Sequence, residues 1–240
     1  MIFRAFVFCR NVIRYVYLRI FQKEGENLSN CVIFCAGGFR ELIYPITSED
    51  YIIAADGGLR HVESLGLTPQ RILGDFDSLG YVPQDAHCFP VEKDDTDAML
   101  AIRHGLELGY DRFVLYGCLD GPRLDHTLAN FQALQYLADN HATGYLVGNA
   151  YIATVIRNEQ VSFLPDCTGI LSVFCMGADA KGVTIRGLKY NLENGILTAG
   201  FPLGVSNHFV GKAASVSVMD GSLLILYAKE NGFPQKEVSE

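Results

Sequence analysis

The sequence predicts two domains: an α/β domain built on a parallel sheet between helical layers (α/β/α), followed by an all-β sandwich. From Cys31 to about Gly148, short apolar runs alternate with helical patterns, which is typical of a parallel sheet covered on both faces. After Asn149 the helical pattern disappears, and short strands separated by Gly, Asn and Asp follow one another. Hydrophobic residues make up 49% and charged residues 19%, so the chain can bury a core and is not disordered over most of its length.

The first domain is expected over residues 30–148. Its predicted strands are apolar runs, most of which lead directly into Gly or Asp, at 31–38, 51–58, 71–78, 87–91 and 112–118. Its predicted helices lie at 61–67, 96–109 and 124–140. The last helix is the clearest, because apolar residues recur at helical spacing at Leu124, Leu128, Phe131, Leu134 and Leu137.

The second domain is expected over residues 149–231, with a C-terminal tail at 232–240. Its predicted strands lie at 151–157, 161–166, 169–176, 182–188, 195–200, 213–220 and 222–229. They are short and bounded by strong turn residues, as in a sandwich or barrel.

Residues 1–29 form a basic leader that differs from the rest of the chain. Residues 1–23 contain five basic and no acidic residues, whereas the remainder carries 14 basic and 27 acidic residues. The acidic body argues against nucleic acid as a partner. Arginines interrupt the apolar leader, so no run approaches the ~20 residues of a membrane span. We expect the leader to lie outside the catalytic core, with an amphipathic helix at a membrane surface as the alternative.

The seven cysteines also bear on location. No Cys-x-x-Cys pair occurs, and several cysteines lie inside apolar runs. Buried, reduced thiols in a cytoplasmic protein explain this usage best, and a zinc site is not expected.

Carboxylates gather where the predicted parallel strands end. Asp56 ends the second run, Asp75 and Asp77 end the third, and acidic residues also follow the fourth and fifth runs at 92–97 and 120–125. Ligands of open α/β sheets bind beyond the carboxyl ends of the strands. Two carboxylates held close together repel unless a cation lies between them, and Mg²⁺ carried by nucleotide phosphates is the natural one.

Neighbouring residues fit the same interpretation. Gly74 would let the backbone approach a ligand, Arg123 would bind a phosphate through two hydrogen bonds, and Lys93 would act as a point charge. The plainer alternative is that Asp95 or Thr96 simply caps the following helix. The sequence has no G-x-x-x-x-G-K-[ST] motif, so a P-loop enzyme is excluded.

At this point the sequence resembles the thiamine pyrophosphokinase (thiamine diphosphokinase) family, most closely its bacterial members. The matching segments are ADGG at 55–58, GDFDSL at 74–79, KDDTDAMLAI at 93–102, PRLDHTLAN at 122–130 and GLKYNLEN…GVSNHFVG within 187–211. The resemblance covers about residues 30–228, in order along the chain. It implies an ATP-binding α/β domain, a thiamine-binding β-sandwich, and a homodimer with thiamine bound between subunits.

The resemblance also implies a set of site residues. Asp75, Asp77, Asp97 and Asp125 would be catalytic and would hold Mg²⁺ with the triphosphate. ATP would also contact Asp56, Gly57, Gly74, Ser78, Lys93, Thr96, Arg123 and His126, and thiamine would contact Ser206 and Asn207. The implied reaction transfers pyrophosphate from ATP to thiamine, giving thiamine diphosphate and AMP.

Two other functions stay open at this point. One is a pyrophosphokinase of the same fold that acts on another hydroxymethyl acceptor, such as a pterin. The other is a non-catalytic sensor of nucleotide or thiamine, although a sensor has no need of so many acidic ligands.

Overall fold

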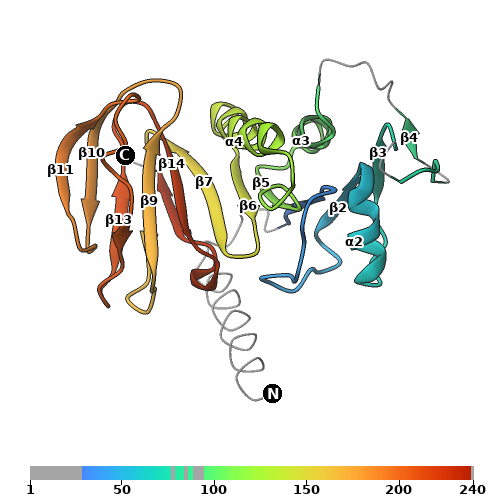
Figure 1. Cartoon of the computed structure of the whole chain (residues 1–240), viewed down its shortest axis with the longest axis horizontal. Coiled ribbons are helices and arrows are strands. Elements are labelled where there is room, and N and C mark those ends of the chain that lie inside the picture. The colour runs from blue at the N-terminus through green and yellow to red at the C-terminus, as the bar shows by residue number, and fades with distance from the viewer. Residues whose placement is uncertain (1–28, 77–78, 84–85, 89–94, 239–240) are drawn as a thin grey trace. The chain divides into compact units, whose positions relative to one another are not determined.

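The computed structural model describes residues 29–76, 79–83, 86–88 and 95–238. These residues form two compact units. Residues 29–41 together with 46–149 form the α/β unit, and residues 42–45 together with 150–238 form the β unit. Figure 1 labels elements of both units.

The α/β unit contains a parallel sheet with the strand order β6-β5-β1-β2-β3-β4. Its strands are β1 (Cys31–Phe34), β2 (Tyr51–Ala55), β3 (Arg71–Gly74), β4 (His87–Cys88), β5 (Arg112–Tyr116) and β6 (Thr143–Val147). Its helices are η1 (Asp56–Gly58), α2 (Leu59–Ser64), α3 (Asp97–Glu107) and α4 (Leu124–Asp139). The predicted α/β fold class is confirmed, and β6 is a strand that the sequence analysis did not identify.

The direction in which the chain crosses the sheet reverses between β1 and β5. From β1 the chain adds β2, β3 and β4 on one side, and β5 and β6 then lie on the other side. Because all these strands are parallel, their carboxyl ends meet at one edge. In open α/β sheets this switch point opens a crevice between the loops that leave in opposite directions.

Helices α3 and α4 pack on the sheet through small and apolar contacts. A Cβ atom added at Gly105 of α3 would lie 2.5 Å from the Phe113 ring and 2.8 Å from Cys31 Sγ, so only glycine allows this close approach. In α4, Leu134 and Leu137 are fully buried, whereas Leu124 and Leu128 are 72% and 57% exposed. The helical spacing of the leucines is therefore correct, but only the C-terminal half of α4 buries them.

The β unit consists of two antiparallel sheets, as predicted. Their orders are β12-β9-β14-β7 and β11-β10-β13-β8-β15. The strands are β7 (Tyr151–Arg157), β8 (Glu159–Phe163), β9 (Ile170–Cys175), β10 (Ala180–Arg186), β11 (Leu192–Leu197), β12 (Asn207–His208), β13 (Ala214–Ser217), β14 (Ser222–Ala228) and β15 (Gln235–Val238). Phe163 of β8 packs edge-on against Tyr227 of β14, with ring centroids 5.1 Å apart, so the two sheets share a core.

Two segments join the β unit in ways that the sequence did not predict. The short helix η2 (Lys229–Asn231) leads into β15, which pairs antiparallel with β8 inside the segment that was expected to be a tail. Tyr44, far away in the sequence, packs its ring against Phe233, with centroids 5.8 Å apart. Among the described residues, no helix combines the length and the apolar character that crossing a membrane requires.

Candidate functional site

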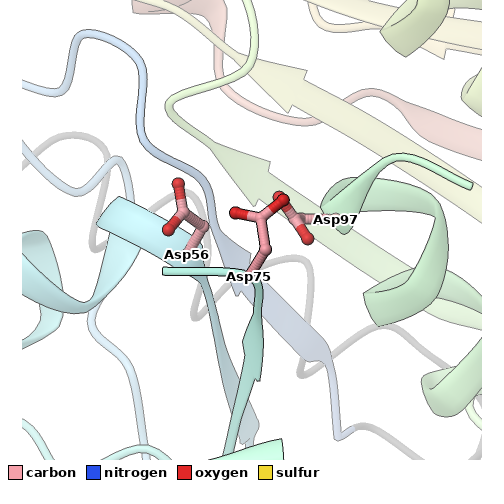
Figure 2. Close-up of side chains that lie close together, drawn as sticks. All are labelled: Asp56, Asp75 and Asp97. Atoms are coloured by element: carbon pink, nitrogen blue, oxygen red, sulfur yellow. The ribbon is translucent and has the colours of Figure 1, made fainter. Parts of the chain in front are cut away.

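Three aspartates converge at the carboxyl edge of the parallel sheet. Asp56 begins η1 after β2, Asp75 follows β3, and Asp97 is the first residue of α3. Each contributes a carboxylate oxygen, and these oxygens all lie within 4.8 Å of one another (Figure 2). Residues separated by about twenty positions in sequence are thus brought together by the order of strands in the sheet.

Asp56 is held in an unusual backbone conformation. Its φ is +48°, in the left-handed region, and its side chain is buried. Such a conformation in a residue other than glycine is a strain that surrounding structure must maintain. Two residues further on, a Cβ atom on Gly58 would lie 1.9 Å from the Phe34 carbonyl oxygen at the end of β1, so only glycine fits there. The ADGG segment is therefore pressed against the adjacent strand.

The end of β3 and the loop after it pack against this cluster, and Gly74, the last residue of β3, lies next to Asp56. A Cβ atom on Gly74 would lie 3.1 Å from the Asp56 backbone nitrogen, Cα and Cβ, and the φ of Gly74 is +147°. Gly74 therefore allows β3 to lie close to Asp56. From the sequence, this glycine was expected to let the backbone approach a ligand. Phe76, next to Asp75, also has a left-handed φ of +62°, and its buried ring anchors the loop.

Asp97 is positioned by the start of α3. Thr96 is the N-cap residue, and its hydroxyl oxygen accepts the Met99 N–H at 3.3 Å. This is the capping role that the sequence analysis weighed against ligand binding for Thr96. The preceding Asp95 forms an ion pair with Arg103 at 2.6 Å instead of joining the cluster.

The chemistry of this cluster is that of a site for a hard cation. Three carboxylates within 4.8 Å repel one another, and a divalent cation with oxygen ligands relieves that repulsion. The donor set therefore fits a metal ion. From the sequence, Asp56 was expected to contact ATP and not the metal; the signal for its place in the cluster is an aspartate directly after a buried strand and before two glycines.

Several predicted site residues lie outside the described residues or outside the cluster. Asp77, Ser78 and Lys93 are not described. Asp125 is exposed and forms a two-point ion pair with Arg123, with Arg123 Nε to Oδ1 at 3.2 Å and Nη2 to Oδ2 at 2.5 Å. This hydrogen-bonded guanidinium lowers the pKa of Asp125. The two residues thus contact each other at the start of α4, where His126 is also exposed.

The loops after β1 and β5 meet at the switch point. The Gly37 N–H donates to the Gly117 carbonyl oxygen at 3.0 Å, and the Gly37 carbonyl oxygen lies 2.8 Å from His61 Nε2. Asp120, one of the acidic residues noted after the fifth run, accepts the Asn149 N–H at 2.6 Å through its side chain. These contacts fix the two loops at the switch point.

The predicted thiamine contacts belong to the β unit. Ser206 is exposed with a left-handed φ of +60°, and its N–H donates to the Ser172 hydroxyl at 3.0 Å. Asn207 is buried, and its side-chain amide bonds to the backbone: Oδ1 accepts the Tyr190 N–H at 2.9 Å and Nδ2 donates to the Tyr190 carbonyl at 2.6 Å. In the structure, the Asn207 side chain therefore holds the backbone at Tyr190 in place.

Comparison with known proteins gives one consistent result. The family model for the thiamin pyrophosphokinase catalytic domain matches residues 44–146, and that for the thiamin pyrophosphokinase vitamin B1 binding domain matches residues 155–223. The thiamine pyrophosphokinase of Bacillus subtilis is 28% identical over 214 residues, which are 80% of this chain and 95% of that protein.

Solved structures agree with this. The chain is similar to a thiamin pyrophosphokinase from Geobacillus thermodenitrificans, with a TM-score of 0.69 and 25% identity over 85% of this chain and 99% of that one. The yeast thiamin pyrophosphokinase, at 15% identity and a TM-score of 0.65 over 87% of this chain and 88% of that one, shares the fold.

Proposed function

The chain belongs to the thiamine pyrophosphokinase family, and from this premise we infer that it transfers the pyrophosphate group of ATP to thiamine, releasing AMP. The observation that carries the inference is the convergence of Asp56, Asp75 and Asp97 at the carboxyl edge of a parallel sheet, within the segment matched by the catalytic-domain model. The matched vitamin B1 binding domain supports thiamine as the acceptor.

We propose that the cation is Mg²⁺, held by Asp56, Asp75 and Asp97, with Asp77 and Asp125 as further ligands. Oxygen-only donors at a partly exposed site suit Mg²⁺, which commonly binds through one or two carboxylates together with substrate phosphates. When bound, the cation neutralises charge on the phosphate oxygens of ATP. The buried Asp56 and the capped start of α3 keep these oxygens in place before ATP arrives.

The reaction asks the protein mainly for positioning. The thiamine hydroxyl attacks the β-phosphorus of ATP, the bond from that phosphorus to the α–β bridging oxygen breaks, and AMP leaves with that oxygen. One of the aspartate carboxylates accepts the hydroxyl proton. Arg123, with Lys93, stabilises negative charge on the phosphates. Since Arg123 is paired with Asp125 in the structure, we propose that phosphate replaces Asp125 as its partner.

The remaining ATP-binding residues of this proposal are Gly57, Gly74, Ser78, Thr96 and His126. For the acceptor, we propose that the loop carrying Ser206 contacts thiamine, with Asn207 holding the neighbouring Tyr190 segment. We further propose that the protein works as a homodimer in the cytoplasm, where buried thiols such as those of Cys31 and Cys167 stay reduced.

The test is incubation of the full chain with Mg-ATP and thiamine, followed by separation of nucleotides and thiamine esters. The expected products are AMP and thiamine diphosphate in equal amounts. ADP would indicate simple phosphoryl transfer, and AMP formed only with a hydroxymethyl pterin would indicate the other acceptor. Binding of thiamine or ATP without turnover would support a sensor.

Substitution of the cluster tests the catalytic assignment. Asp75→Ala and Asp77→Ala are expected to abolish turnover while the far-ultraviolet circular dichroism spectrum stays that of the wild type. Asp111→Ala, an exposed carboxylate next to the amino end of β5, is the matched control and should keep its activity. Retention of more than about a tenth of wild-type activity by Asp75→Ala would contradict its role as a ligand.

A further inference from the structure

Two cysteines meet at the switch point of the parallel sheet. Cys35 directly follows β1, and Cys118 lies two residues beyond β5. The carbonyl oxygen of Tyr116 accepts both the Cys35 backbone N–H, at 2.9 Å, and the Cys118 thiol, at 3.7 Å. Both cysteines carry free thiols. The backbone of Cys35 and the thiol of Cys118 therefore bond to the same carbonyl oxygen, although 83 positions separate the two residues in sequence.

The backbone explains why the two side chains share one side. In the register of β1 and β5, Phe34 lies opposite Tyr116, so Cys35 comes opposite Gly117. A regular strand would then point Cys118 to the other face. Gly117 turns the chain with a φ of +72°, at a place where a Cβ atom would lie 2.2 Å from the Cys35 carbonyl oxygen. This turn brings Cys118 around to Cys35.

The two thiols interact and differ in exposure. A hydrogen bond with Cys35 and, after it, burial raise the pKa of Cys118. Cys118 is 3% exposed, whereas Cys35 is half-buried, so an oxidant from solvent reaches Cys35 first. Adjacent strands lie about 4.8 Å apart and disulfides join Cα atoms about 4.4–6.8 Å apart, so cysteines that follow neighbouring strands are suited to pairing.

We propose that Cys35 and Cys118 are a redox modification site, at which a peroxide converts the two thiols into a reversible disulfide. The Cys35 thiol gives up its proton, its sulfur attacks a peroxide oxygen, the O–O bond breaks, and the departing hydroxide takes the proton, so that Cys35 sulfenic acid and water form. The Cys118 sulfur then attacks the Cys35 sulfur, the S–O bond breaks, and a second water leaves. Two thiols lose two electrons and two protons in total, and one hydrogen peroxide becomes two waters. A dithiol reductant reverses the reaction.

The bond would constrain the two loops at the switch point. A disulfide fixes the S–S distance at about 2.05 Å, which is shorter than any thiol–thiol contact, so it ties the segments at Gly37 and Gly117 together in a new arrangement. The loop after β5 continues to Arg123. Displacement of catalytic groups by about 1 Å can lower a rate by up to about a hundredfold. Coupling to turnover rests on the proposed function, whereas disulfide formation does not.

The first experiment treats the full chain with hydrogen peroxide, blocks remaining thiols by alkylation, digests without reductant and maps peptides by mass spectrometry. We expect peptides containing Cys35 and Cys118 to be joined, and to separate after dithiothreitol. The joined pair should persist in Cys175→Ser, the matched control at another free thiol, and be absent from Cys118→Ser. In that variant dimedone should label Cys35. Alkylation of both Cys35 and Cys118 in peroxide-treated wild type would overturn the proposal.

The second experiment measures turnover of the same samples. We expect the cross-linked protein to lose activity at least about threefold and to regain it with dithiothreitol, while reduced Cys118→Ser keeps wild-type activity. Full activity in completely cross-linked protein would overturn the coupling to the site but leave the modification site standing. A protein without turnover in either state would contradict the proposed function alone, because the peptide map reports the disulfide independently.

Discussion

Neutralising one carboxylate of the cluster should stabilise the metal-free protein while it impairs cation binding. Asp75→Asn keeps the shape of the side chain and removes its charge. Two unit charges 4.8 Å apart, the upper limit for this cluster, repel by about 3.5 kcal/mol at an effective dielectric constant of about 20. Asp75 faces two such partners, but Asp75 and Asp97 are half-exposed and solvent screens them. We therefore expect the free energy of unfolding to rise by about 1–2 kcal/mol.

The assay is urea unfolding followed by circular dichroism, with EDTA and then with MgCl₂. In EDTA the midpoint of Asp75→Asn should exceed that of the wild type. Mg²⁺ at about ten times its dissociation constant should stabilise the wild type by about 1.4 kcal/mol and the variant by clearly less. Asp111→Asn, next to the amino end of β5, removes an exposed charge outside the cluster and should change neither result.

The reasoning would be refuted by either of two results. One is a variant that unfolds at lower urea than the wild type in EDTA, which would mean that Asp75 makes net favourable contacts in the free protein. The other is equal stabilisation of variant and wild type by Mg²⁺, which would place the cation elsewhere.

Three further predictions test the surroundings of the site. Gly74→Ala should lower the free energy of unfolding by about 1–3 kcal/mol because of its φ, and should lower turnover about tenfold because the added Cβ displaces Asp56. The control is Gly66→Ala, where φ is +68° and no atom lies within 4 Å of an added Cβ. That variant should lose stability but keep its turnover. Asn207→Ala should cost about 2–3 kcal/mol in urea unfolding by leaving the Tyr190 backbone groups without their partner, and a loss below about 0.5 kcal/mol would contradict the clamp. Arg123→Gln should raise the pKa of Asp125 toward its ordinary value in a carboxyl NMR titration. Because the wild-type pKa is lowered, the ion pair stabilises the fold at pH values above the ordinary aspartate pKa, and this stabilisation is lost as the pH falls through the pKa of the folded state. An unchanged pKa in the variant would exclude the ion pair in solution.

Local patterns in the sequence were sufficient for the fold class. The runs at 31–34, 51–55 and 113–116 are apolar because both faces of a parallel strand are buried, and this requirement appears in the sequence of each strand by itself. After Asn149 the helical periodicity is lost and short strands alternate with turn residues, and this pattern marks the antiparallel unit. The carboxylates were also visible, since Asp56 and Asp75 lie directly at the ends of their apolar runs and the other acidic residues lie in the loops that follow such runs.

The sequence could not show which of these carboxylates meet. Asp56 joins Asp75 and Asp97 because β2 and β3 are neighbours in the sheet and α3 begins beside them, whereas Asp125 starts a different helix and pairs with Arg123. The pairing of β15 with β8, the contact of Tyr44 with Phe233, and the meeting of Cys35 with Cys118 likewise join distant positions. The burial of a strand or helix can be inferred from the residues of that element alone. Contacts between distant residues, by contrast, follow from the order of strands in the sheet and from single turns such as that at Gly117. By itself, therefore, the sequence determined the fold class, the family resemblance and the candidate acidic residues, and only the tertiary structure decided which residues form the cluster.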